Sequence, residues 1–525
     1  MLTDIRQLTD GSRIESDVCF VGAGAAGITL ARELGNLGRK VCLLESGGLE
    51  NDDDTQDLYD GEDIGIPYPV YGSRLRFFGG STNHWAGWCQ PLDPIDFEAR
   101  SWVSHSGWPI AYDDVFPYYV RAQEVVELGP FNYDPGYWEQ FYKDRGYKRF
   151  PLAESRVSTK LWHLSPPTRF GKVYRDEIEK SDTISAYLYA NVVDILTDEN
   201  ARQVTGLKVA SLDGKSFEVT GNTYVLATGG IENPRLLLTA DGVQKEGLGN
   251  GNDLVGRFFM EHPRVTVAHL MLPNKDNAAA FYLDNWDTSN ERQVLACMSL
   301  TADIQESERL LNYSSNLVPV SPGADSDGYG SLREIVGGWR KEQVPDNLSE
   351  HIGNIIADLD DVASALYGRF FGAGESRLFR MEARTEQAPN PDSRVLLAAE
   401  RDALGMRRID LDWRMTDRDM YSIVRSTGIL GQEFGRAGLG RIKTSLSEND
   451  DDWPLYLSGG NHHMGTTRMA DDAKRGVVDK NCRVHGIDKL YVAGSSVFPT
   501  CGYANPTLTI VALALRLADH FGGNS

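Results

Sequence analysis

Two adjacent histidines near the end of the chain are the strongest candidates for chemistry. His462 and His463 stand side by side in "NHHMGTTRM", and Asn505 follows in "GYANPTLTIV". A neutral imidazole can accept the proton of a hydroxyl group, and an ordinary pKa of about 6.5 leaves it mostly neutral at pH 7. Because adjacent side chains of extended backbone point in opposite directions, only one of these histidines is expected to face a given site.

The elements around Asn505 are expected to position it. Residues 490–493 form a short apolar strand that ends in Gly494, and residues 505–521 form a helix that is apolar nearly all round. Such a helix should be buried. Asn505 suits the N-cap position and Pro506 the first helical position, so capping is the alternative to a chemical role for Asn505. The positive end of the helix would favour negative charge on a bound group.

The N-terminal segment "DVCFVGAGAAGITLARELGNLGRKVCLLESGG" indicates a dinucleotide site. It predicts a strand, a glycine turn, an amphipathic helix and a second strand that ends at Glu45. Gly22, Gly24 and Gly27 form a GxGxxG turn, which lets backbone N–H groups approach a pyrophosphate. Glu45 follows Gly24 by 21 residues, where a carboxylate would bind a ribose diol. This motif alone does not distinguish FAD from NAD.

Residues 74–119, which begin "RLRFFGGSTNHWAGW", resemble the glucose-methanol-choline (GMC) family of flavoprotein alcohol oxidoreductases. Further similar segments follow in the family's order at 189–195, 224–238, 254–263, 386–397 and from Gly460 to the C-terminus. "GGSTNHW" and "HHMG", with "ANPTLT", are most similar to the pyranose-oxidase and bacterial sugar (glycoside) oxidase branch. The resemblance implies FAD and an α/β fold: a Rossmann-like FAD-binding domain with a second α+β substrate domain built on an antiparallel sheet.

The same resemblance implies roles for individual residues. His462 would be the catalytic base, Asn505 would hold the substrate oxygen, and His463 would turn away into the structure. His84 either carries the flavin through a covalent bond or only packs beside the ring. His262 is interpreted as structural, and no metal site is expected. The residues expected to contact FAD are Gly22, Gly24, Gly27, Glu45, Gly79, Gly80, Ser81, Asn83, His84, Val193, Ala227, Gly494, Asn505, Pro506 and Thr507.

The length of 525 residues favours two domains. The predicted FAD-binding domain is discontinuous, comprising residues 1–95, 186–263 and 451–525, and the substrate-binding domain comprises 96–185 and 264–450. A glycine- and serine-rich stretch at 321–331 is either a mobile loop over the site or a plain surface loop. Aromatic residues could face a sugar ring, although most are expected to be core: Trp85, Trp88, Trp102, Trp108 and Tyr112.

Composition limits the partners and the compartment. A net charge of −22 argues against nucleic acid and favours neutral or cationic small molecules. The sequence contains no signal-peptide pattern and no stretch of about 18 apolar residues, so no membrane association and a cytoplasmic protein are expected. Six scattered cysteines without a CxxC pair predict reduced, mostly buried thiols. The sequence does not predict an oligomeric state.

These observations together predict an FAD-dependent enzyme that oxidises a secondary alcohol of a sugar or glycoside to a ketone. One alternative is a GMC oxidoreductase that acts on a non-sugar alcohol, either aryl or aliphatic. An alternative of another class is a flavin-binding protein without alcohol redox turnover. The electron acceptor, whether oxygen, a quinone or another molecule, is not predicted.

Overall fold

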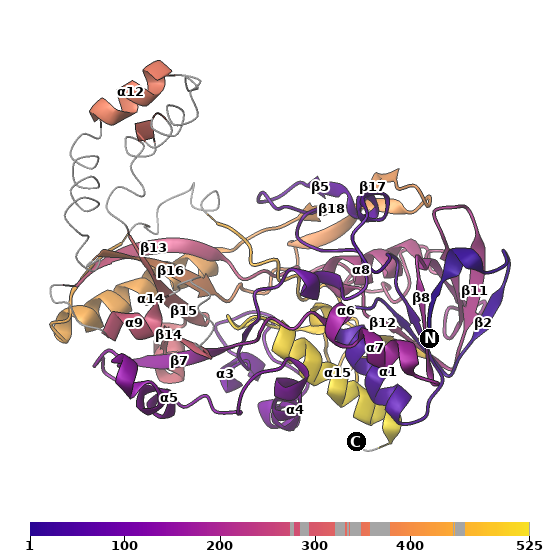
Figure 1. Cartoon of the computed structure of the whole chain (residues 1–525), viewed down its shortest axis with the longest axis horizontal. Helices are drawn as coiled ribbons and strands as arrows, with labels where there is room; N and C mark the ends of the chain where they lie inside the picture. The colour runs from indigo at the N-terminus through magenta and orange to yellow at the C-terminus, as the bar shows by residue number, and fades with distance from the viewer. Residues whose placement is uncertain are drawn as a thin grey trace.

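The fold was analysed in a computed structural model of the chain. The structure describes residues 1–272, 278–283, 293–320, 331–332, 335, 348–357, 378–444, 446 and 457–523. Two large sheets organise it: a parallel sheet on the right of Figure 1 and an antiparallel sheet on the left. The predicted fold class is confirmed.

The parallel sheet has six strands in the order β1-β8-β4-β3-β12-β20. Their bounds are Leu2–Asp4, Ile184–Leu188, Val41–Leu44, Val18–Val21, Thr223–Leu226 and Leu490–Val492. Every residue of β3 and β4 is buried, as expected for parallel strands that are covered on both faces. Helix α1 (Ala25–Asn36) contacts both of these strands and also α15 (Thr507–Gly522). The predicted strand, turn, helix and strand therefore occur in order.

Two smaller sheets flank the parallel sheet. One has the order β2-β11-β10-β9, with bounds Arg13–Glu15, Ser216–Thr220, Val204–Ala210 and Asn191–Thr197. The other pairs β17 (Arg394–Arg401) with β18 (Arg407–Asp412), and β18 with β5 (Gly61–Asp63). Helix α8 (Gly229–Thr239) contacts β9 and β17, so it joins the two small sheets.

The antiparallel sheet has seven strands in the order β19-β13-β16-β15-β14-β7-β6. Their bounds are Arg441–Thr444, Arg264–Met271, Leu378–Thr385, Tyr313–Pro319, Val294–Leu300, Val157–Leu164 and Trp88–Cys89. On β16, apolar Phe379, Met381 and Ala383 join the core that includes residues of α14 (Asp417–Arg436). The residues that alternate with them are Arg380, Glu382 and Arg384, so the opposite face of this strand is charged.

Shorter helices and α4 complete the described structure. Helix α4 (Tyr112–Val125) falls in the predicted substrate segment but contacts α15. Strand β8 begins at Ile184, two residues before the predicted segment start at 186. The domain boundaries stay a prediction. The remaining helices are α2 (Asp53–Gln56), α3 (Pro94–Phe97), α5 (Pro135–Phe141), α6 (Phe170–Val173), α7 (Arg175–Lys180), α9 (Ala278–Tyr282), α10 (Ala302–Glu308) and α12 (Leu348–Ala357).

Several local predictions have definite outcomes. The short alternating or apolar stretches at 264–272 and 407–415 predict strands, and they contain β13 and β18. The stretch at 349–372 predicts a helix; α12 covers it up to residue 357, and residues 358–377 lie outside the described part. The stretch at 321–331 also lies outside it, except for Ser331. All six cysteines are free and buried, as predicted. Among the described helices, none has the length and apolar character needed to cross a bilayer.

Candidate active site

A cavity of about 480 Å³ joins the GxGxxG turn to the paired histidines. Its lining includes the turn between β3 and α1 and the end of β4. It also includes His262, His462 and Asn505. The segment from Arg74 to Trp88 and the first residues of α15 form its side walls. Residues from distant parts of the chain therefore share one enclosed site.

The three glycines of the turn serve different purposes. Gly22 has a φ of +100°, and a Cβ there would lie 2.7 Å from the Ala227 carbonyl oxygen. A Cβ on Gly27 would lie 1.9 Å from the carbonyl oxygen of Gly22, so Gly27 allows α1 to pack against the turn. A Cβ on Gly24 would meet no atom within 4 Å. Gly24 thus leaves open space on the cavity wall, at the N-terminus of α1, where a ligand's phosphate can approach.

Glu45 lies on the same wall, directly after β4, and is buried. Its Oε2 accepts a hydrogen bond from the Ala23 N–H at 2.9 Å, and its Oε1 accepts one from the Gly47 N–H at 3.0 Å. The carboxylate therefore ties the glycine turn to the end of β4. Carboxylate oxygens have further acceptor positions, which leaves Glu45 able to bind a ribose hydroxyl.

The loop between residues 79 and 88 forms a second wall. Gly80, Ser81 and His84 line the cavity, together with Trp85 and Trp88. His84 is exposed as a whole residue, but its ring is partly desolvated by the surrounding protein. This desolvation, followed by the charge of Arg169, lowers the pKa of His84. A neutral imidazole therefore faces the cavity at neutral pH.

The rings of His462 and His463 have different neighbours. The Nδ1 of His462 lies 2.9 Å from the Nδ1 of His262, and its Nε2 lies 3.4 Å from the Nδ2 of Asn505. The ring of His463 packs edge-on against Tyr68, with centroids 5.6 Å apart, and lies 6.0 Å from the Phe259 ring. Thus His462 meets the polar groups of the cavity, while His463 is held among aromatic rings.

One buried carboxylate holds the backbone at both histidine segments. The Oε1 of Glu261 accepts hydrogen bonds from the His462 N–H at 2.7 Å and from the Tyr68 hydroxyl at 2.8 Å. Its Oε2 accepts the His262 N–H at 2.5 Å. Burial raises the pKa of Glu261 to about 7, although these hydrogen bonds oppose that rise. Glu261 therefore sets the separation of the His262 and His462 main chains.

Burial also keeps the histidine pair uncharged. It lowers the pKa of His262 to about 4 and holds the pKa of His462 well below its ordinary 6.5. Electrostatic repulsion between a protonated His462 and His262, His463 and Arg384 lowers the pKa of His462 further. At neutral pH His462 is thus a neutral imidazole, the form that accepts a proton.

Asn505 does not act as the predicted helix cap. Helix α15 begins at Thr507, Pro506 occupies the cap position, and no side chain caps the helix. The Asn505 side chain instead turns toward His462, and its Oδ1 is buried without a hydrogen-bond partner in the described structure. The prediction placed the helix start one residue too early, because an Asn-Pro pair looks the same whether its amide caps the helix or faces a cavity.

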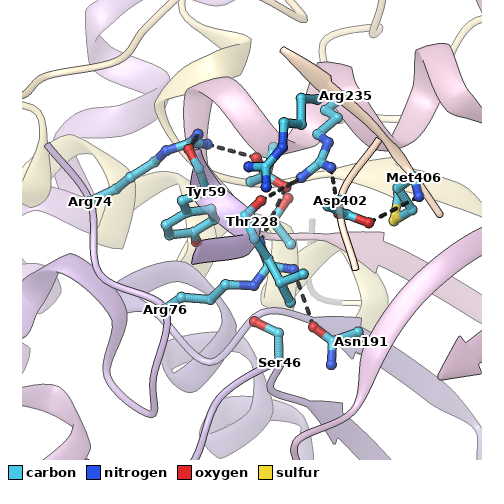
Figure 2. Close-up of polar contacts among 12 residues, drawn as sticks. Ser46, Tyr59, Arg74, Arg76, Asn191, Thr228, Arg235, Asp402 and Met406 are labelled. Carbon is cyan, nitrogen blue, oxygen red and sulfur yellow. Dashed lines mark hydrogen bonds and ion pairs between the residues drawn. The ribbon is translucent and has the colours of Figure 1, made fainter. Parts of the chain in front are cut away.

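A buried ionic network (Figure 2) borders the cavity through Arg74 and Arg76. Arg74 and Arg235 donate to opposite oxygens of Glu232 at 2.7 and 3.1 Å, and Arg235 also donates to Asp402 at 2.7 Å. Arg76 lies 3.4 Å from Glu232 and donates to the Asn191 side chain at 3.3 Å. Three guanidiniums thus face two carboxylates. The Nε of Arg76 is buried without a partner among the described residues, and Arg76 lines the cavity.

The structure brings most of the predicted site residues together. Four of them do not line the cavity. Gly27 and Gly79 pack against neighbouring backbone, and the Asn83 side chain donates a hydrogen bond to the Phe78 carbonyl at 3.0 Å. Val193 on β9 does not line the cavity, whereas its neighbour Val192 does. Successive side chains of a strand point to opposite faces, which explains the last difference. The predicted residues that do line it are Gly22, Gly24, Glu45, Gly80, Ser81, His84, Ala227, His462, Gly494, Asn505, Pro506 and Thr507.

Sequence reasoning missed other residues of the site. His262 was interpreted as structural, yet it lines the cavity and contacts His462. Arg264 and Arg384, directly opposite one another on β13 and β16, also line it. The only sequence signal for His262 was its place in the "FMEHP" stretch. The arginines gave no signal, because a charge on a strand usually faces solvent.

Comparison with known proteins identifies this architecture. A family model described as "GMC oxidoreductase" matches residues 389–514. The fructose dehydrogenase large subunit of Gluconobacter japonicus is 24% identical over 580 residues, which covers 96% of this chain and 97% of that protein. The C-terminal part of the chain thus matches the GMC oxidoreductase family. A C-glycoside 3-oxidase of Microbacterium trichothecenolyticum is 37% identical over 123 residues, covering 23% of this chain and 22% of that protein.

The fold also has counterparts among solved structures. Pyridoxine 4-oxidase from "Mesorbium loti" superposes with a TM-score of 0.57 at 16% identity, covering 97% of this chain and all of that one. The predictions of a flavin-dependent oxidoreductase and of FAD as its cofactor are confirmed. Among the described residues, no group of three or more histidine, cysteine or acidic side chains is arranged to bind a metal ion.

The chemistry of the residues that line the cavity fits FAD. Gly24 leaves the space a pyrophosphate requires, and Glu45 presents a carboxylate where a ribose would lie. The additional positive charge of the arginine network, with the unpartnered Nε of Arg76, complements a diphosphate. Asn505, which also lines the cavity, has a buried Oδ1 without a hydrogen-bond partner in the described structure.

Proposed function

We propose that this protein oxidises a secondary hydroxyl group of a pyranose or glycoside to a ketone, using FAD. The observation that carries the proposal is the His462 and Asn505 pair, whose facing nitrogens lie 3.4 Å apart in the cavity that the dinucleotide turn also lines. An imidazole acceptor and an amide donor beside one another can bind a single hydroxyl group from two sides.

The two residues divide the work on the alcohol. The neutral His462 takes the hydroxyl proton, and the Asn505 amide donates a hydrogen bond to the oxygen, which becomes the carbonyl. Bound FAD supplies the acceptor for the hydride that leaves the carbon. The N-terminus of α15, where Pro506 and Thr507 line the cavity, favours negative charge on a bound group. In this role Asn505 acts on the substrate and does not serve only as a helix cap.

The cavity wall beside the histidines supports a polyhydroxylated substrate. The guanidinium of Arg384 stacks over Trp88 at 4.3 Å from the ring centroid, and both residues line the cavity with Arg264. Asn461 adds a polar side chain to the lining of the cavity. An aromatic face beside several hydrogen-bond donors suits a sugar ring better than an apolar alcohol. The names of the fructose dehydrogenase and C-glycoside 3-oxidase relatives agree with this substrate class.

An anaerobic substrate panel tests the proposal. The yellow holoenzyme is mixed with pyranoses, glycosides, and aryl and aliphatic alcohols, and the visible flavin band is followed. Bleaching by sugars, with a keto-sugar product, supports the proposal. Bleaching only by non-sugar alcohols moves the assignment to the alternative substrate class, and no bleaching by any alcohol supports a flavin-binding protein without alcohol turnover. Reoxidation with oxygen or quinones then identifies the electron acceptor.

The position of His84 bears on how FAD is held. Its neutral imidazole faces the cavity, as a covalent bond to the flavin requires, yet the same position suits plain packing beside the ring. Acid precipitation of the holoenzyme distinguishes the two. Yellow colour in the pellet, lost in His84→Ala, means covalent attachment, and yellow colour in the supernatant means packing alone.

A further inference from the structure

We infer that His262 is a positioning residue that fixes the tautomer of His462, so that the Nε2 of His462 carries the lone pair that faces the substrate. The inference rests on the proposed function of His462 as the base. It assigns a role to a side chain that lies on the cavity wall, 200 positions from His462 in the chain.

The carbonyl oxygen of Cys501 can only accept a hydrogen bond. The Nε2 of His262 lies 3.1 Å from the Cys501 carbonyl oxygen, so this nitrogen carries a proton and donates. Burial lowers the pKa of His262 to about 4, and its ring is therefore neutral at neutral pH. A neutral imidazole has one donor and one acceptor nitrogen. The Nδ1 of His262 is consequently an acceptor.

The hydrogen bond between the two histidine rings fixes the position of the proton on His462. The two Nδ1 atoms are 2.9 Å apart, a hydrogen-bond distance, and one of them must donate. Because His262 is the acceptor, the proton lies on the Nδ1 of His462. The neutral ring of His462 then has its lone pair on Nε2, the nitrogen that faces the Asn505 amide at 3.4 Å. The other tautomer would place a proton on this nitrogen, which could no longer accept one from an alcohol.

The surroundings keep both rings in the required state. A doubly protonated His262 would donate from Nδ1 and force the wrong tautomer on His462. Burial disfavours that cation, and so does the nearby charge of Arg384, although Glu386 acts in the opposite direction. The titratable and charged groups that face His462 are His262, His463 and Arg384, and each of them disfavours a protonated His462. Glu261, by binding the backbone N–H of both histidines, holds the two rings in register.

Spectroscopy tests the tautomer directly. The holoenzyme is labelled with ¹⁵N-histidine, and two-bond ¹H–¹⁵N spectra identify which nitrogen of each ring is protonated. The signals of His462 and His262 are assigned by their loss in His462→Ala and in His262→Asn. We expect a proton on Nδ1 of His462 and on Nε2 of His262. A proton on Nε2 of His462, or a charged ring at pH 7, overturns the inference. Because no substrate is added, this result is independent of the proposed sugar oxidation.

Two matched variants test the consequence for catalysis. The side-chain oxygen of Asn in His262→Asn occupies the place of Nδ1 and keeps the acceptor, whereas the amide of Gln in His262→Gln occupies the place of Nε2 and keeps only the donor to Cys501. Loss of the partner that sets a catalytic tautomer costs up to about 10⁴-fold in serine proteases. We expect anaerobic flavin reduction at least about tenfold slower in His262→Gln than in His262→Asn, with substrate affinity, FAD content and melting temperature similar in both.

The outcomes separate the two proposals. A slower His262→Gln with an intact His262→Asn supports positioning. Equal rates in the two variants mean that the acceptor at the place of Nδ1 is not required, and a greater loss in His262→Asn means that the bond to Cys501 matters more. Either result overturns the inference. If the spectra show the expected tautomer but no alcohol bleaches the flavin, the proposed function fails while the tautomer assignment stands.

Discussion

The Nδ2 of Asn505 lies 3.4 Å from the Nε2 of His462, although the two residues belong to separate segments on either side of β20. One segment is the irregular chain after Gly460, and the other is the residue pair that precedes α15. A Cβ on Gly460 would lie 2.6 Å from the Nδ1 of His462, so the glycine lets the ring fold back against its own backbone. The pair is thus built by close packing of a loop against a helix start.

Replacement of the base should remove the reaction without removing the cofactor. We expect His462→Ala to slow anaerobic flavin reduction about 10²- to 10⁴-fold, because a general base contributes that range. FAD should stay bound, since the substitution leaves the dinucleotide turn and Glu45 unchanged. Stopped-flow reduction and the flavin absorbance of the purified variant measure both. Asn505→Ala is the comparison, with a smaller loss of about tenfold. An unchanged rate in His462→Ala would sink the assignment.

The pH dependence of reduction should report the lowered pKa of His462. The base works in its neutral form, so a pKa well below 6.5 keeps it active as the pH falls through 6.5. Burial is the main cause, and His262, His463 and Arg384 add to it. We expect the limiting rate of flavin reduction to be flat from pH 8 to below 6.5 and to decrease only at lower pH. A half-maximal rate near pH 6.5 would contradict this environment.

The glycine turn allows the fold to be separated from the cofactor. Gly24→Ala should fold, because its Cβ meets no protein atom within 4 Å, but the methyl group should weaken FAD binding at least about tenfold by filling the cradle. Gly27→Ala should damage folding, since its Cβ would lie 1.9 Å from the Gly22 carbonyl oxygen. Titration of apoprotein with FAD and thermal melting distinguish the two effects. Wild-type affinity in Gly24→Ala would show that the pyrophosphate lies elsewhere.

The buried ionic network should contribute strongly to stability. Asp402 and Arg235 have side chains only 1% and 2% exposed. Asp402→Ala leaves the Arg235 guanidinium with an unpaired nitrogen, and breaking a buried pair in this way costs about 3–5 kcal/mol. Urea unfolding followed by tryptophan fluorescence measures the loss. The control is Asp176→Ala, which breaks a fully exposed pair with Lys180 and should leave the midpoint unchanged. Equal midpoints in both variants would refute the prediction.

Local patterns were sufficient for much of the fold. The GxGxxG turn with its flanking strands, the end of β4 at Glu45 and the apolar helix α15 follow from spacing and periodicity, which short-range sterics dictate. His462 and Asn505 were also predictable, because their segments resemble those of a family. The start of α15 was not, since the same Asn-Pro pair serves a cap or a cavity-facing amide.

The sequence by itself therefore determined the dinucleotide turn, the order of the elements and the residue that we propose as the base. Only the tertiary structure decided that His262 meets His462, that Glu261 holds both backbones, and that Arg264 and Arg384 line the same cavity. These contacts join segments from different sheets and loops. Propensity and periodicity act over a few neighbouring residues, whereas the meeting of distant polar side chains depends on how the sheets and α15 pack together.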